Sequence, residues 1–191
     1  MRNLIFLFLL LPIGLLAQRD SVYVKTDIFT AVYSEVLQQP KWVTYTVQCS
    51  NGKTPRTGMD FYTVPDIITS DNADYVDNVY DKGHCAPAAD FNCTKEMLYK
   101  TFSYVNCVLQ NQYLNRGVWR LLEAYERDLA ATTGVTVKIK MVYSNTSIKL
   151  PTGATIPDGF YKIITYNNRV EKYYFPNTKP TSSDFKQYLV K

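Results

Sequence analysis

The only histidine of the chain, His84, follows Asp81-Lys82-Gly83 and precedes Cys85-Ala86-Pro87-Ala88-Ala89-Asp90. Histidine is the side chain best suited to take a proton from water near neutral pH. A lysine two residues away and an adjacent glycine form an unusual setting for a core residue. A lone histidine is nevertheless often structural. The local spacing therefore leaves two interpretations open, a general base and a structural residue.

A second group of polar residues lies on one predicted helix, from about Asn115 to Ala131 and ending near Gly134. At 100° per residue, an apolar stripe faces the core; it comprises Val118, Leu121, Leu122, Tyr125 and Leu129. A different face carries Asn115, Trp119, Glu123, Glu126 and Arg127. Helix geometry alone favours a solvated face with a Glu–Arg pair four residues apart, which contributes about 0.2–0.5 kcal/mol.

Three ordered motifs connect these groups. The segment 81–90 resembles D-R-G-H-x-A-P-A-A-D, a signature of the DNA/RNA non-specific endonucleases, which are ββα-metal or His-Me finger nucleases. Residues 101–111 are similar to the family's T-F-x-x-S-N-x-x-P-Q-N. Residues 114–123 resemble L-N-x-G-x-W-x-x-L-E, and Arg127 follows where the family has an arginine. Weaker similarity around Trp42, Arg56 and Leu150-Pro151 extends the resemblance over nearly all of the chain after residue 17.

The resemblance implies a hydrolase that cuts DNA and RNA with little sequence preference and leaves 5′-phosphate ends. His84 would deprotonate the attacking water, and Asn115 would bind one divalent cation, Mg²⁺ or a substitute such as Mn²⁺. Glu123 would hold water molecules bound to that ion. Asn106 would orient His84 or a water of the site. Positive charge on the phosphate side would come from Lys82, Arg56 and Arg127.

The sequence departs from the family pattern at Lys82, where an arginine is usual. Lysine keeps the charge and loses the two-pronged hydrogen bonding of a guanidinium, so transition-state stabilisation would be weaker. Leu109 and Val105 replace the usual proline and serine. The alternative function is a non-catalytic, secreted relative that binds nucleic acid or another polyanion. A toxin nuclease and an unrelated secreted α+β protein are further alternatives.

The first residues have the composition of a secretory signal peptide. Arg2 precedes an apolar run from Leu4 to Leu16, and Ala17 ends the run before polar sequence. The run is short for a membrane span, although a retained anchor is the alternative. We therefore expect a signal peptide over 1–17, a single domain over 18–191, and a periplasmic or extracellular protein without stable membrane insertion. The oligomeric state stays open.

Four cysteines accompany this expected export: Cys49, Cys85, Cys93 and Cys107. No C-x-x-C pair and only one histidine are present, so an ordinary zinc site is not expected. We expect one or two disulfides, among three complete pairings. A Cys85–Cys107 bridge is one hypothesis, because each cysteine follows a candidate site residue.

The elements that must position these residues indicate an α+β fold, with a central antiparallel sheet and one long helix. Alternating or β-branched sequence predicts strands over 21–25, 42–47, 80–84, 101–109, 135–143, 161–166 and 173–175. A helix is expected within 88–99, and an ordered loop over 54–78. The 46% of hydrophobic residues suits one domain, and the net charge of +4 is compatible with a polyanionic substrate without demonstrating one.

Overall fold

A computed structural model describes residues 17–49 and 51–190. Six antiparallel strands form the main sheet in the order β1-β2-β3-β6-β7-β8. These strands are β1 (Val22–Lys25), β2 (Phe29–Ser34), β3 (Gln39–Thr46), β6 (Thr136–Val142), β7 (Gly159–Tyr166) and β8 (Arg169–Pro176). A second, two-stranded antiparallel sheet pairs β4 (Tyr80–His84) with β5 (Cys107–Asn111). The expected α+β class with a central antiparallel sheet is confirmed.

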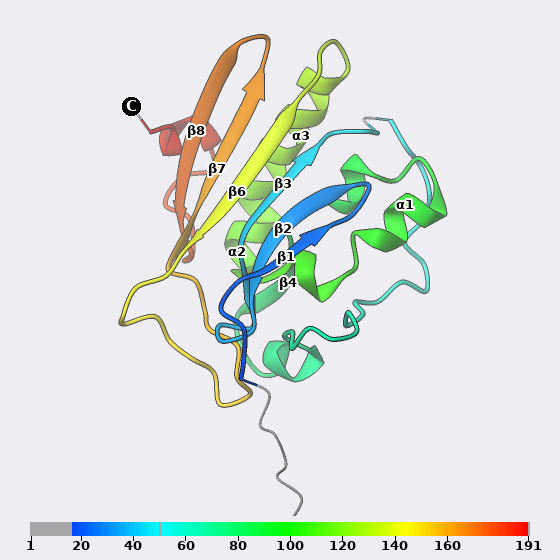
Figure 1. Cartoon of the computed structure of the whole chain (residues 1–191). Helices are drawn as coiled ribbons and strands as arrows, with labels where there is room; N and C mark the ends of the chain where they lie inside the picture. The colour runs from blue at the N-terminus through cyan, green and yellow to red at the C-terminus, as the bar shows by residue number, and fades with distance from the viewer. Residues whose placement is uncertain (1–16, 50, 191) are drawn as a thin grey trace, which may run out of the picture.

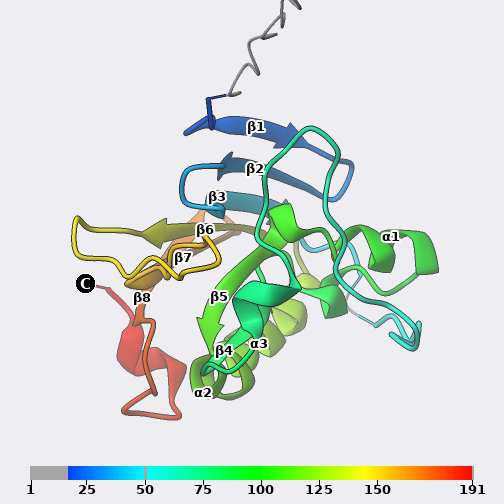
Figure 2. The same ribbon diagram turned by 90° about the horizontal axis from the view of Figure 1, so that it is seen from below.

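Helical segments lie mainly on one side of the main sheet, together with β4 and β5 (Figures 1 and 2). The longest is α3 (Arg120–Ala130). The others are short: η1 (Asn72–Tyr75), η2 (Ala88–Asp90), α1 (Lys95–Lys100), η3 (Tyr104–Asn106), α2 (Gln112–Leu114), the π-helical turn η4 (Asn115–Trp119) and η5 (Phe185–Tyr188). The main hydrophobic core lies between the sheet and this layer. No helix covers the other side of the sheet in the described chain (Figure 2).

The alternation of residue types along β6 explains this arrangement. Val137, Ile139 and Met141 are buried against the helical layer, whereas Thr136, Lys138 and Lys140 are exposed. Successive side chains of a strand point to opposite faces, so one face joins the core and the other meets solvent. Trp119 crosses from η4 to this core and makes edge contacts with Phe160 and Phe175 on the last two strands.

Most predicted strands are confirmed with shifted ends, and so is a helix in the region 88–99, but the start of one predicted strand was assigned wrongly. The strand expected over 101–109 begins only at Cys107, after η3, because the buried Asn106 side chain hydrogen-bonds to the backbone around it. The helix expected within 88–99 is split into η2 and α1. Thr94 caps α1 and thereby starts a new helix. Strand β2 was missed, and the loop over 54–78 contains only η1 as a helical element.

The long helix also differs from an ideal helix. Residues 115–119 form a π-helical turn, and Gly117 has φ −99° and ψ −118°. A π turn changes the phase of the residues that follow it. Trp119 and Glu126 were expected on the polar face, yet both are buried, and Leu121 of the expected core stripe is 39% exposed.

One disulfide, Cys49–Cys93, joins the end of β3 to the segment before α1. The hypothesis of a Cys85–Cys107 bridge is wrong, because both cysteines are free and buried. His84 pairs with Cys107, and the Cys85 amide donates to the Asn106 carbonyl. Cys85 and Cys107 are therefore one register position apart and point to opposite faces of the pair.

The expected signal peptide over 1–17 lies, except for Ala17, outside the described residues. Across residues 17–49 and 51–190, none of the helices combines the length and apolar character that a bilayer crossing requires.

The Cys49–Cys93 bridge closes a loop with a sequence separation of 44 residues. Closing such a loop restricts the unfolded chain, so the C49A/C93A variant should lose about 2–4 kcal/mol of unfolding free energy. Urea unfolding of the two proteins measures this loss. Alkylation and non-reducing digestion should find the bridge and two thiols; a bridge at Cys85 or Cys107 would contradict the structure.

Candidate active site

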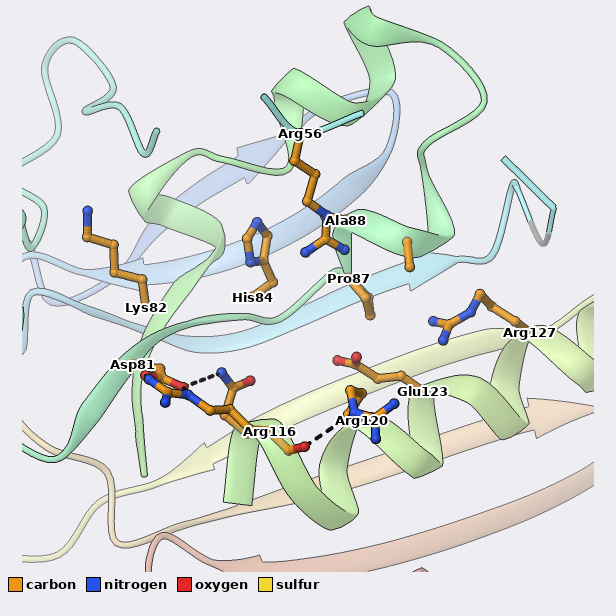
Figure 3. Close-up of a pocket in the computed structure, with 12 residues that line it drawn as sticks. Arg56, Asp81, Lys82, His84, Pro87, Ala88, Arg116, Arg120, Glu123 and Arg127 are labelled. Atoms are coloured by element: carbon orange, nitrogen blue, oxygen red, sulfur yellow. Dashed lines mark hydrogen bonds and ion pairs between the residues drawn. The ribbon is translucent and has the colours of Figure 1, made fainter. Parts of the chain in front are cut away.

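A pocket of about 650 Å³ opens between β4 and the helical segment η4–α3. Figure 3 shows His84 across this pocket from Glu123. The pocket is lined by Arg56, Asp81, Lys82, His84, Pro87, Ala88, Ala89, Asn115, Arg116, Arg120, Glu123 and Arg127. Of the seven residues expected from the sequence, six line this pocket, and Asn106 lies behind it.

Backbone pairing fixes the strand that carries His84. Residues 80–84 pair with residues 107–111 along the whole of β4. Gly83 is required in this strand, because a Cβ atom there would lie 2.7 Å from the Cβ of Gln110. The strand ends at His84, and Pro87 then turns the chain into η2. This end of the strand pair places the imidazole at the pocket.

Asn106 fixes the segment after His84 rather than the imidazole itself. Its Oδ1 accepts from the Ala86 amide at 2.8 Å, and its Nδ2 donates to the carbonyls of Ala86 and Thr101, both at 2.9 Å. The side chain is fully buried. Asn106 is therefore a positioning residue for the turn that leads away from His84.

The His84 ring is half-buried between aromatic side chains. The ring centroids of Phe61 and Phe102 lie 4.6 Å and 4.8 Å from the imidazole centroid. Nε2 is enclosed and has no hydrogen-bond partner among the described residues, whereas Nδ1 is not enclosed in this way. Burial, with the nearby Arg56 charge, lowers the pKa of His84 to about 3. The imidazole is therefore neutral at pH 7, which is the form that a general base requires.

Asn115 is held in place by a carboxylate from β4. Its Nδ2 donates to Asp81 Oδ2 at 2.9 Å, and the same carboxylate accepts from Arg116 Nε at 2.9 Å and Nη2 at 2.6 Å. These bonds fix the amide plane and leave Asn115 Oδ1 without a hydrogen-bond donor among the described residues. The free carbonyl oxygen lies on the pocket wall.

Glu123 lies on α3, near a buried ion pair. Lys162 and Glu126 are fully buried and form an ion pair at 2.8 Å; Lys162 also lies 4.4 Å from the centre of the Trp119 ring. Burial raises the pKa of Glu123, and the positive charge of Lys162 opposes that shift. Lys162 thus favours the ionised form of the pocket carboxylate.

Four arginines face the pocket, whereas the charge of Lys82 is directed elsewhere. Lys82 Nζ pairs with Asp60 at 3.0 Å, donates to Asn72, and lies over the rings of Phe61 and Tyr104. Arg127 donates to the buried Asp90 at 2.9 Å. The cationic side chains around the pocket are those of Arg56, Arg116, Arg120 and Arg127.

Sequence reasoning missed four residues that shape this site. Asp81 anchors Asn115, Asp90 anchors Arg127, and Arg116 and Arg120 add further cations. Both aspartates stood inside the motif over 81–90, so the motif itself was the signal that could have identified them. Arg120 Nε donates to the Arg116 carbonyl at 3.2 Å, and both side chains line the pocket.

The donors at this site suit a hard divalent ion. Asn115 Oδ1 is a free oxygen, and the Glu123 carboxylate lines the same pocket. No group of three or more His, Cys, Asp or Glu residues in the described chain could enclose an ion. An ion bound here would have few protein ligands and would keep several waters, which matches the behaviour of Mg²⁺.

Comparison with known families identifies the family of this chain. A family model described as DNA/RNA non-specific endonuclease matches residues 12–191. The chain belongs to the DNA/RNA non-specific endonuclease family. Among its relatives, the mitochondrial nuclease EXOG of Danio rerio is 32% identical over 102 residues, which are 51% of this chain and 30% of that protein. A nuclease of Nostoc sp. is 30% identical over 129 residues, covering 61% and 47% of the two chains.

A solved structure of another family protein, in the EndoG/EndoGI complex, has the same fold. It superposes with a TM-score of 0.78 at 23% identity and covers 88% of this chain and 80% of that chain. The endonuclease fold is therefore established, including its ββα-metal arrangement. The matched segment spans less than half the length of the EXOG and Nostoc relatives.

The lowered pKa of His84 predicts a pH-dependent stability. An unfolded histidine titrates near pH 6.5, whereas the folded group titrates at about 3. Between these values only the unfolded chain binds the proton, so unfolding free energy falls as the pH drops from about 6.5 to about 3. At pH values above about 6.5, the neutral imidazole makes its full contribution to the unfolding free energy. In the His84→Gln variant, the loss of unfolding free energy on acidification should be smaller by on the order of 2 kcal/mol, a value that allows for the partial exposure of the His84 ring.

Urea unfolding of both proteins at pH 7 and pH 4.5 measures this difference. The carboxylates are common to the two chains, so their contribution cancels in the comparison. Equal losses in the two proteins would show that the folded imidazole titrates normally.

Proposed function

We propose that this chain is an exported, metal-dependent endonuclease that hydrolyses phosphodiester bonds in DNA and RNA with little sequence preference. One observation carries the proposal: His84 and the free carbonyl of Asn115 line the same pocket from two separate segments. A protein that only binds polyanions needs neither a neutral base nor an oxygen donor for an ion. Family membership supports the same reaction class.

His84 would act as the general base. Its ring is neutral, and Nδ1 is the nitrogen open to the pocket, so a water between His84 and a bound phosphate could transfer its proton there. The water oxygen would form a bond to phosphorus as the bond to the 3′ oxygen breaks. The 3′ oxygen would leave as a hydroxyl with a proton from a second water, and the other product would carry the 5′-phosphate. A positioned base contributes about 10²–10⁴ in rate, so other groups must supply the remaining acceleration.

Asn115 and Glu123 would hold the divalent ion, Asn115 directly and Glu123 through bound waters. Bound Mg²⁺ would stabilise negative charge that develops on the phosphate oxygens. Asp81 orients the ligand amide by accepting from its Nδ2. The ionised Glu123, favoured by Lys162 beneath it, would accept hydrogen bonds from the waters of the ion.

The arginines would bind the substrate backbone. Arg56 and Arg127 lie near His84 and Glu123 and would offset charge at the scissile phosphate (Figure 3). Arg116 and Arg120 would contact flanking phosphates. Contacts to phosphates carry no base information, which accounts for weak sequence preference. With its ammonium held by Asp60, Lys82 would fix the loop over 54–78 to β4 instead of binding phosphate.

Export to the periplasm or the medium is the proposed location. The basic and apolar start of the sequence supports it, and so does the Cys49–Cys93 disulfide, because such bonds persist in oxidising compartments. The substrates there would be nucleic acids outside the cytoplasm.

The central test is digestion of plasmid DNA and of RNA by the purified chain. We expect cleavage with Mg²⁺ or Mn²⁺ and none with EDTA. His84→Ala should lower turnover by at least about 10² and leave binding to DNA largely unchanged. Binding without cleavage by the wild-type chain, under every divalent metal, would favour the non-catalytic alternative.

Metal affinity should depend on Asp81. Removing its carboxylate in Asp81→Ala frees the Asn115 amide to rotate, so Mn²⁺ affinity should fall by about 10–100-fold in calorimetry. Arg116→Gln is the matched control, because it removes the other partner of Asp81 and keeps the bond to Asn115. If local charge alone set the affinity, Arg116→Gln would raise it, because the substitution removes a positive charge near the ion. A rise in the control similar in size to the loss in Asp81→Ala would therefore show that charge, and not amide orientation, sets the affinity.

A further inference from the structure

The side of the main sheet that faces away from the active site carries a row of six paired residues, four of which are aromatic. Residues paired directly across six strands form this aromatic row: Tyr23, Val32, Trp42, Lys140, Tyr161 and Tyr174. Tyr23 is 64% exposed. Tyr23 contacts Trp42 at a centroid distance of 6.5 Å, and Tyr161 contacts Tyr174 at 4.9 Å. No helix covers this outer face in the described chain (Figure 2).

The adjacent row on the same face is cationic. This lysine row consists of Lys25, Thr30, Thr44, Lys138, Ile163 and Lys172, again paired strand by strand. Lys138 Nζ lies 4.7 Å from the Trp42 ring centroid, and Lys172 Nζ lies 4.4 Å from that of Tyr161. With Lys140, the two rows contain four lysines and no carboxylate. The outer face is therefore positively charged along its full width.

A hollow of about 550 Å³ lies beside the aromatic row. Trp42, Lys140 and Tyr161 line it together with Lys41 and Tyr143. The carboxylate at this hollow, Asp20, is paired with Lys41 at 2.7 Å. Rings, cations and a recess of this size thus occur together, at a distance from His84 and Asn115.

We propose that the outer face is a second nucleic-acid-binding site, which holds single-stranded DNA or RNA by stacking bases on the aromatic row and pairing phosphates with the lysine row. Rings on an open sheet stack bases without regard to sequence, and lysines beside them neutralise the backbone. A second copy of the chain is a poorer occupant, because it would oppose four lysines with four lysines. The site would raise the local concentration of long substrates at the enzyme.

This proposal takes its ligand class from the proposed function, but its test requires no cleavage. The His84→Ala chain in EDTA is titrated with a fluorescein-labelled oligothymidylate. Trp42 is the partly exposed tryptophan and Trp119 is buried, so stacking should quench the fluorescence of Trp42. Quenching should be absent in Trp42→Phe. Binding without any quenching would overturn the proposal.

Charge variants separate this face from general electrostatics. Lys138→Gln with Lys140→Gln should lower the slope of log affinity against log salt by about 1.4, because each single-strand phosphate contact contributes about 0.7. Lys95→Gln with Lys186→Gln removes the same charge from exposed positions on α1 and η5 and should leave the slope unchanged. Equal effects of the two pairs would overturn the proposal.

Removing the rings tests stacking directly. Trp42→Thr with Tyr161→Thr should weaken binding about tenfold or more, with circular dichroism as the check on folding.

Two other outcomes would overturn the proposal. One is a dimer in sedimentation that the Trp42/Tyr161 variant dissociates, which would identify the face as an interface between copies. The other is binding to phosphatidylglycerol vesicles without binding to the oligonucleotide. If the wild-type chain had no nuclease activity, the proposed function would be contradicted, but the oligonucleotide-binding test of the outer face would be unaffected.

Discussion

The site depends on one hydrogen bond between two parts of the fold, from Asn115 Nδ2 to Asp81 Oδ2 at 2.9 Å. Asp81 belongs to the strand that carries His84, and Asn115 begins the π turn before α3. The bond therefore ties Asn115 to the strand that carries His84 and fixes the orientation of the Asn115 amide. A carboxylate can accept several bonds at once, which is why Arg116 shares it without displacing Asn115.

A buried layer of charge supports this arrangement from below. Lys162 on β7 pairs with Glu126 on α3, and Tyr45 on β3 donates to the same carboxylate at 2.8 Å. Buried ion pairs are costly to desolvate and add little net stability, so their value here lies in fixing α3 on the sheet in one rotation. That rotation directs Glu123 and Arg127 into the pocket. The same sheet exposes lysines and rings on its other side, so the two faces of one scaffold have separate electrostatic characters.

Much of the fold followed from local pattern. Alternation in β6 and β7 predicted strands because a sheet with one buried face needs that period. Strand β2 was missed although Phe29, Thr30, Val32 and Tyr33 are strand-forming residues and burial alternates from Phe29 to Tyr33. The segment 101–106 has strand-like composition but turns, because Asn106 supplies hydrogen bonds that a strand partner would otherwise provide. Tertiary satisfaction of polar groups overrode propensity in segment 101–106.

The sequence by itself determined the motif over 81–90 and the family, and it singled out His84, Asn115 and Glu123 as candidate site residues, because these depend on residue type and order. Only the tertiary structure decided which cations reach the pocket. Lys82 is held by Asp60, and Arg116 and Arg120 line the site through a π turn that an ideal helix does not contain. It also decided which cysteines form a disulfide: Cys85 and Cys107 are one register position apart, point to opposite faces of the strand pair and stay free. Strand register and helix phase arise from packing among distant segments, and no local pattern specifies them.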